Sequence, residues 1–94
     1  MKLGIVVGQV VSTVKHSGLQ REILLLVEML TPDGQPSGDF HVAADSLGAG
    51  NGEWVLLVAG SSARRMLDEN TPVDLGVVGI IDEVVYQQQV VYHK

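Results

Sequence analysis

The feature that most constrains the fold of this chain is the segment DSLGAGNGEWVLLVAGSSAR, residues 45–64. It contains a glycine-dense turn, an apolar run from Trp54 to Ala59, and a second turn of small residues that ends in an arginine. A strand without polar side chains must be covered on both faces. Because 94 residues enclose little interior, we expect another subunit to cover part of this strand. The segment therefore favours a component of an assembly over an enzyme.

Composition predicts one small, strand-rich domain over residues 1–94. Hydrophobic residues make up 46% of the chain and charged residues only 18%, and the apolar residues are mainly Val, Leu and Ile, which favour strands. So much apolar surface on a small body predicts burial between subunits, and hence a homo-oligomer.

Charge and cysteine content exclude several classes of partner. The net charge is −5 and the six Lys and Arg residues are scattered, which argues against a nucleic-acid partner. The absence of Cys excludes disulfides and Cys-bound metals, and the cytoplasm is the expected compartment. No segment approaches the ~20 apolar residues of a membrane helix, so no membrane partner is expected.

Alternation and turn residues predict five main strands and one short helix. The tight-turn sequence Thr31-Pro32-Asp33-Gly34 separates the second strand from the third. In the first strand, Val6, Gly8 and Val10 are expected on one face. The helix is expected at Gly60–Leu67, capped by a serine. This pattern predicts a small closed or partly closed barrel. The expected strands are Lys2–Lys15, Glu22–Thr31, Phe40–Ala44, Trp54–Ala59 and Val73–Tyr86, with a short tail strand at Val90–Tyr92.

The chain offers no catalytic or cofactor-binding constellation, so we predict no catalytic residue, no metal site and no cofactor. The GAGNG sequence at 48–52 lacks the spacing of a dinucleotide fingerprint, and a strand follows it instead of a helix. The segment 60–63 lacks the closing glycine of a nucleophile elbow. Asp82 and Glu83 are adjacent, so on a strand they point to opposite faces and cannot form a dyad.

The glycine turn, GSSAR at 60–64 and TPVDLGVVGIIDEV at 71–84 together resemble the EutN/CcmL family of bacterial microcompartment shell vertex proteins. The resemblance covers essentially the whole chain, from the opening MKLGIVVGQVVSTVKH to the tail QVVYHK, and points to the ethanolamine-utilisation branch. It implies a five-stranded OB-like β-barrel with one short helix that assembles as a cyclic pentamer. Such pentamers cap the vertices of a cytoplasmic polyhedral shell whose other tiles are hexameric, and the family has no catalytic residues.

The resemblance also implies two groups of assembly residues, without a firm division between their roles. We expect Gly48 and Gly50 to need positive φ or close approach to a neighbour, so that a β-branched residue at either position prevents ring formation. The first group, at subunit contacts or around the central opening, is Gly48, Ala49, Gly50, Gly52 and Glu53. The second group, at contacts with the shell, is Gly60, Ser61, Ser62, Ala63 and Arg64.

Two other classes of function stand beside this reading. A small OB-type binding module for an anionic or nucleotide ligand would need exposed aromatic residues on a basic groove, whereas the four aromatic residues here are dispersed among acidic ones. An enzyme would need a catalytic constellation, which the sequence does not offer. Within the shell reading, ethanolamine, choline and diol compartments all stay open.

Overall fold

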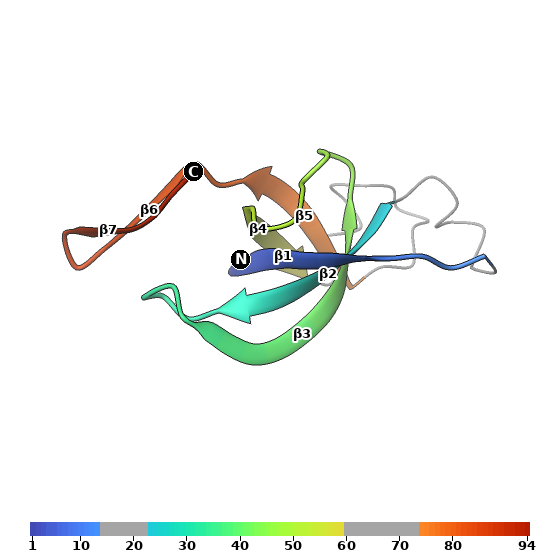
Figure 1. The fold of residues 1–94 in the computed structure, drawn as a ribbon, viewed down its shortest axis with the longest axis horizontal. Coiled ribbons are helices and arrows are strands. Elements are labelled where there is room, and N and C mark those ends of the chain that lie inside the picture. Colours follow the sequence, from blue (N-terminus) through green and yellow to red (C-terminus); the bar gives the residue numbers. More distant parts are fainter. Residues whose placement is uncertain (14–22, 60–73) are drawn as a thin grey trace.

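The computed structural model describes residues 1–13, 23–59 and 74–94, and within these ranges the chain forms strands and no helix (Figure 1). No helix long and apolar enough to cross a membrane is therefore present among the described residues. The helix expected at Gly60–Leu67 lies outside them. The strands are β1 (Lys2–Val10), β2 (Ile23–Leu30), β3 (Pro36–Asp45), β4 (Trp54–Ala59), β5 (Leu75–Ile80), β6 (Glu83–Tyr86) and β7 (Gln89–His93).

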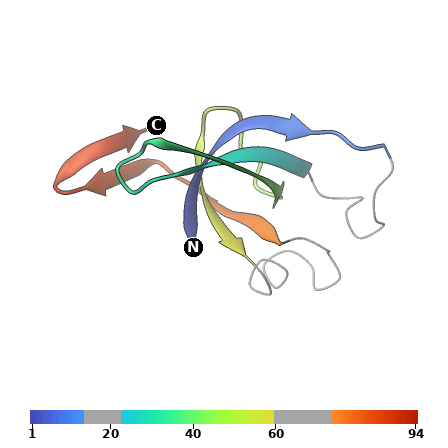
Figure 2. The same cartoon turned by 90° about the horizontal axis from the view of Figure 1, so that it is seen from below.

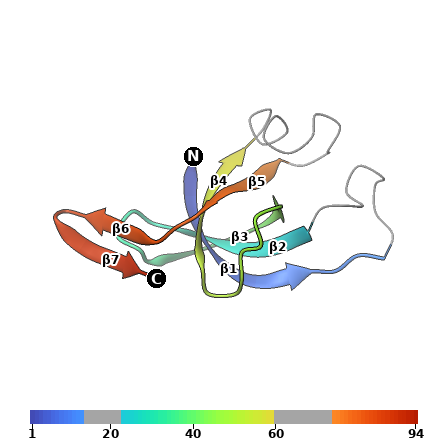
Figure 3. The ribbon, with the colours of Figure 1, turned by 90° about the horizontal axis from the view of Figure 1, so that it is seen from above.

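The first five strands close into a barrel in the order β1-β2-β3-β5-β4, seen from below in Figure 2. All neighbouring pairs are antiparallel except β3 and β5, which run parallel. This arrangement confirms the expected five-stranded OB-like barrel. Strands β6 and β7 form a separate hairpin, here called the arm, which projects beyond one end of the barrel (Figures 1 and 3).

Branched aliphatic side chains fill the barrel. On β2, Leu25, Val27 and Met29 are buried, whereas the residues between them are only half-buried. The two-residue repeat of a strand thus places one apolar set inside the barrel. From the other four strands this set is met by Val6, Ala43, Val55, Leu57, Leu75 and Val77.

Strand β1 differs from its prediction in length and in the phase of its alternation. It ends at Val10, short of the expected Lys15. A β-bulge between Val6 and Gly8 adds one residue, Val7, which is 41% exposed. The bulge turns Gly8 to the face opposite Val6, so the expectation that both share a face was wrong.

The prediction of a short third strand at Phe40–Ala44 was also wrong, because β3 starts earlier, at Pro36. Pro36 opens the strand opposite Leu30, at a position where its missing N–H is tolerated. The preceding tight turn is confirmed: Gly34 has φ +86° and donates its N–H to the Thr31 carbonyl at 2.9 Å.

The single strand expected at Val73–Tyr86 divides into β5 and β6, which belong to different sheets. At the division Ile81 is buried, and its N–H donates to the Trp54 carbonyl at 2.9 Å. This contact anchors the chain to the barrel just before it enters the arm. The expected tail strand is confirmed as β7, one residue longer at each end.

Candidate functional site

A buried carboxylate, Asp45, organises the start of the glycine turn. Asp45 ends β3 and is only 1% exposed. Its Oδ1 accepts the N–H of Leu47 at 2.9 Å, and its Oδ2 accepts the N–H groups of Gly48 at 3.1 Å and Ala49 at 2.8 Å. Three charge-assisted hydrogen bonds offset the cost of burying the carboxylate. Asp45 therefore fixes the path of the backbone into the turn.

The end of the turn is held by Glu53 and by backbone bonds to β1. The Oε1 atom of Glu53 accepts the Gly50 N–H at 2.6 Å, and the Glu53 N–H donates to the Gly50 carbonyl at 3.1 Å. The Gly52 N–H donates to the Val6 carbonyl at 2.8 Å, and the Val6 N–H donates to the Glu53 carbonyl at 3.0 Å. The turn is thus fastened at both ends to the wall of the barrel.

Glu53 also joins the turn to the base of the arm. Its Oε2 lies 2.7 Å from Nζ of Lys94, whose backbone N–H donates to the Asp82 carbonyl at 2.8 Å. The hydrogen bond from Lys94, followed by that from Gly50, lowers the pKa of the Glu53 carboxyl. The same contact with Glu53 raises the pKa of the Lys94 ammonium. In the protomer, Glu53 therefore connects two parts of one chain.

The glycines of the turn differ in what they require. Gly48 has φ +85°, where a β-branched residue is strained, although a Cβ there would meet nothing within 4 Å. Gly50 does not have positive φ, and a Cβ on it would lie 3.4 Å from Oε1 of Glu53. The expectation of positive φ is confirmed at Gly48 and does not hold at Gly50, where a Cβ would make an ordinary van der Waals contact with the Glu53 carboxylate.

The second group of predicted assembly residues, Gly60, Ser61, Ser62, Ala63 and Arg64, lies outside the described residues. Their role in contacts with the shell stays a prediction.

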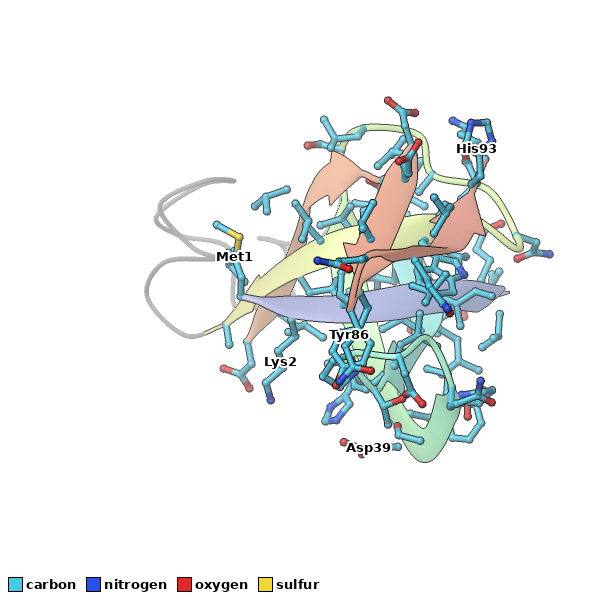
Figure 4. The ribbon with its side chains drawn as sticks, turned by 90° about the vertical axis from the view of Figure 1, so that its left-hand side faces the viewer. Met1, Lys2, Asp39, Tyr86 and His93 are labelled. Atoms are coloured by element: carbon cyan, nitrogen blue, oxygen red, sulfur yellow. The ribbon has the colours of Figure 1, made fainter. Side chains whose placement is uncertain are left out.

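The arm has a fixed base and an exposed apolar tip. At the base, the rings of Tyr92 and Trp54 stack with centroids 4.3 Å apart. Toward the tip, Val85 and Val90 face each other across the hairpin and are 58% and 56% exposed. Figure 4 looks at this end of the molecule, with Tyr86 and His93 of the arm labelled.

A second exposed apolar surface lies on the outside of β3, and sequence reasoning missed it. Phe40 and Val42 are 53% and 48% exposed, whereas Ala43, the next residue of β3, is buried in the core. Their partners on β2 are Glu28, opposite Phe40, and Leu26, opposite Val42. The alternation in the Phe40–Val42 stretch could have revealed this face, had the strand been recognised as long.

The same strand has an open edge. Strand β3 pairs with β2 from Pro36 to Asp45, but on its other side its pairing with β5 is recorded at Ala44 alone. Among the described residues, the β3 segment from 37 to 42 therefore has no strand beside it on that edge.

A shallow cavity of about 400 Å³ opens at the barrel end near the β2–β3 turn. Its charged residues are Lys2 and Asp39, labelled in Figure 4, and Oδ1 of Asp39 lies 3.1 Å from Nε2 of His41. Within residues 1–13, 23–59 and 74–94, no group of three His, Asp or Glu side chains could hold a metal ion. The cavity is lined by Met1, Lys2, Leu3, Met29, Leu30, Pro32, Ser37 and Asp39.

Comparison with known proteins places this geometry in a family. Residues 1–82 match the family model described as ethanolamine utilisation protein EutN/carboxysome. The chain is 58% identical to the bacterial microcompartment shell vertex protein EutN of Escherichia coli K12, over 100% of both proteins.

Solved structures agree with this match. The CcmL structure from Gloeobacter violaceus is 42% identical with a TM-score of 0.94, covering 100% of this chain and 98% of that one. The GrpN pentameric microcompartment shell protein from Rhodospirillum rubrum is 45% identical with a TM-score of 0.85, covering 92% of this chain and 99% of that one. With its family model, its relatives and its barrel in agreement, the chain belongs to the EutN/CcmL family.

Proposed function

We propose that this chain is a structural shell protein whose pentamers cap the vertices of a polyhedral bacterial microcompartment in the cytoplasm, of the ethanolamine or a related catabolic type. The observation that carries the proposal is the full-length identity of 58% to a protein named as a microcompartment shell vertex protein. The likeness to a pentameric shell protein over 92% of this chain supports five-fold assembly. Residues 1–94 act as one vertex domain without catalysis.

The exposed surfaces support assembly. Each protomer exposes Phe40 and Val42 on β3 and Val85 and Val90 on the arm. Leaving apolar surface in water costs roughly 25 cal/mol per Å², so burying these side chains between subunits favours association. This is the property that the apolar sequence led us to expect.

Roles for the predicted assembly residues follow from the same proposal. The turn that holds Gly48, Ala49, Gly50, Gly52 and Glu53 lies at subunit contacts or around the central opening. Its two carboxylate anchors support this role, because a turn fixed at both ends presents a constant shape to a neighbour. Residues 60–64 contact the surrounding hexameric tiles, and Arg64 suits that task because its planar guanidinium forms two directed hydrogen bonds.

A nucleotide-binding module is not favoured by the aromatic residues. Trp54 is only 7% exposed and its ring stacks on that of Tyr92. The two ring faces that meet in this stack are therefore not available to a base. Exposed Phe40 has Asp39 and His41 beside it along the chain and Glu28 opposite it on β2, so its neighbours in the described part of the chain do not form a basic groove.

The proposal is tested by shell closure. Hexameric shell proteins from the same source should form closed polyhedral bodies in cells when this chain is co-expressed, and open or elongated bodies when it is left out, as judged by electron microscopy. The vertex role would be contradicted if closed polyhedra formed equally well when the chain is left out, and if the bodies formed under co-expression contained none of it.

A further inference from the structure

The symmetry of the proposed pentamer constrains how its subunits meet. In a two-fold contact the same patch serves both partners, and such contacts pair subunits. Five subunits in a closed ring cannot all be paired in this way. Each protomer of a pentamer therefore needs two different surfaces, one that fits the next subunit and one that receives the previous subunit. This step rests on the proposed function.

The structure supplies two such surfaces with complementary character. The first is the arm, whose strands pair only with each other among the described residues. The second is the edge of β3 from 37 to 42, with Phe40 and Val42 exposed beside it. Both present backbone hydrogen-bonding groups together with apolar side chains.

The arm does not carry the protection that isolated strand edges usually have, whereas β3 carries some of it before Phe40, namely Pro36, a bulge at 37–39 and the exposed Asp39. Exposed edges are commonly guarded by charged residues, proline or a covering element. The arm has no charged residue in the eight positions from Val84 to Val91. Depletion of charge is characteristic of the buried centre of an interface. The charged residues of this region, Glu83 and Lys94, lie at the base of the arm.

We propose that the arm of one protomer docks along the open edge of β3 in the next protomer, extending that sheet by strand addition. At about 3.3 Å per residue, the regular part of the β3 edge, Phe40–Val42, spans about 10 Å, and the five residues of β7 span about 17 Å, enough to cover it. Backbone hydrogen bonds would set the alignment, while Val85 or Val90 packs against Phe40 and Val42. The partner is a second copy of this chain.

The arm is built to reach outward. Its base is fixed to its own barrel by the Trp54–Tyr92 stack and the Glu53–Lys94 ion pair. Its tip extends away from the barrel in both Figure 1 and Figure 3, within a molecule 44 Å long and 21–23 Å across. A rigid base with an exposed tip suits insertion into a neighbour.

Because the chain has no Cys, disulfide trapping tests the proposal directly. Four double variants combine Phe40→Cys or Val42→Cys with Val85→Cys or Val90→Cys and cover the possible alignments. A disulfide forms only between Cα atoms within about 7 Å. Oxidation of the assembled rings should give at least one variant a ladder of covalent species ending at the pentamer on a non-reducing gel. The control pair Val11→Cys with Val90→Cys, both at exposed positions, should stay monomeric.

The possible results distinguish failure of the docking proposal from failure of the proposed function. Rings that form but give no ladder in any of the four variants would overturn the docking proposal and leave the vertex role intact. A disulfide within one chain would overturn it as well. Wild-type protein that forms no ring would instead refute the proposed function from which the argument starts.

Amide hydrogen exchange of the wild-type ring gives the answer if the cysteine variants fail to assemble. The backbone amides of Phe40–Val42 that point away from β2 should be protected in the ring and exchange rapidly after dilution to monomers. Equal, rapid exchange in both states would overturn the proposal.

Discussion

Replacing the buried carboxylate of Asp45 by an amide should destabilise the protein strongly. In the Asp45→Asn variant the side chain keeps its shape but loses its charge and one acceptor oxygen. Three backbone N–H groups, those of Leu47, Gly48 and Ala49, point at the carboxylate. The single amide oxygen can still accept the two that meet at Oδ2. The amide nitrogen then faces the N–H of Leu47, which places two donors against each other.

The size of the effect follows from these contacts. A hydrogen bond to a charged group contributes about 1.5–3 kcal/mol, and the two remaining bonds weaken when the charge is removed. We expect the free energy of unfolding to fall by about 3 kcal/mol, roughly a hundredfold in the folding equilibrium. For a domain of this size that corresponds to a Tm lower by about 12 °C or more.

Thermal and urea unfolding, followed by the fluorescence of Trp54, measure this change at one fixed protein concentration, because association adds to apparent stability. Asp39→Asn is the matched control: its carboxylate is exposed and contacts His41, so a change within about 0.5 kcal/mol is expected. If Asp45→Asn unfolded within about 0.5 kcal/mol of the wild type, the claim that three amide contacts hold the turn would be wrong.

Three further predictions concern the turn and its connections. Gly48→Val should lower stability by about 2 kcal/mol and weaken ring formation, because φ is +85° there, while Gln9→Val, at an exposed position of β1, should leave native mass spectra unchanged. The lowered pKa of Glu53 means that its stabilising contact with Lys94 is present above the ordinary value of 4.5 and is lost as pH falls further, and the raised pKa of Lys94 means that the contact is lost again well above 10.5. The protection factor of the residue-94 amide, which is its exchange rate relative to the intrinsic rate at the same pH, should therefore fall in acid. Lys94→Ala should abolish that pH dependence. Arg64→Ala should keep the ring but give open or elongated shells if the arginine contacts tiles, should break the ring if the contact is internal, and would refute both roles if shells closed normally.

The barrel could be predicted from the sequence because its strands follow simple patterns. Strand β4 matches its expected bounds of Trp54–Ala59, and β2, described from Ile23, ends at Leu30, one residue before the expected Thr31. The alternation of buried and half-buried residues along β2 is the direct cause of this success. The turn at Gly34 was found because proline and glycine occupy the positions that a tight turn requires.

The errors have physical causes that a sequence pattern does not express. The bulge between Val6 and Gly8 shifts the alternation of β1; Gly8 indicates a bend there but does not show that an extra residue, Val7, enters the strand. The division between β5 and β6 depends on the hydrogen bond from Ile81 to Trp54, a contact between segments far apart in the chain. The long open edge of β3 was hidden because Pro36 and Gly38 are typical of a loop.

The candidate site was predicted only in part for the same reason. The glycine turn was located correctly, but the role of Asp45 depends on three backbone amides that the fold brings to one carboxylate. The link between Glu53 and Lys94 joins residues 41 positions apart and likewise arises only in the folded chain.

Native mass spectrometry of the purified chain at micromolar concentration tests the central claim most directly. A closed ring of five chains of 10.1 kDa should give a dominant species of about 50 kDa. Apolar burial at the arm and at β3 should leave little monomer. A dominant monomer would contradict assembly itself, and a dominant hexamer would contradict the vertex role, because six-fold rings cannot close the corner of a shell.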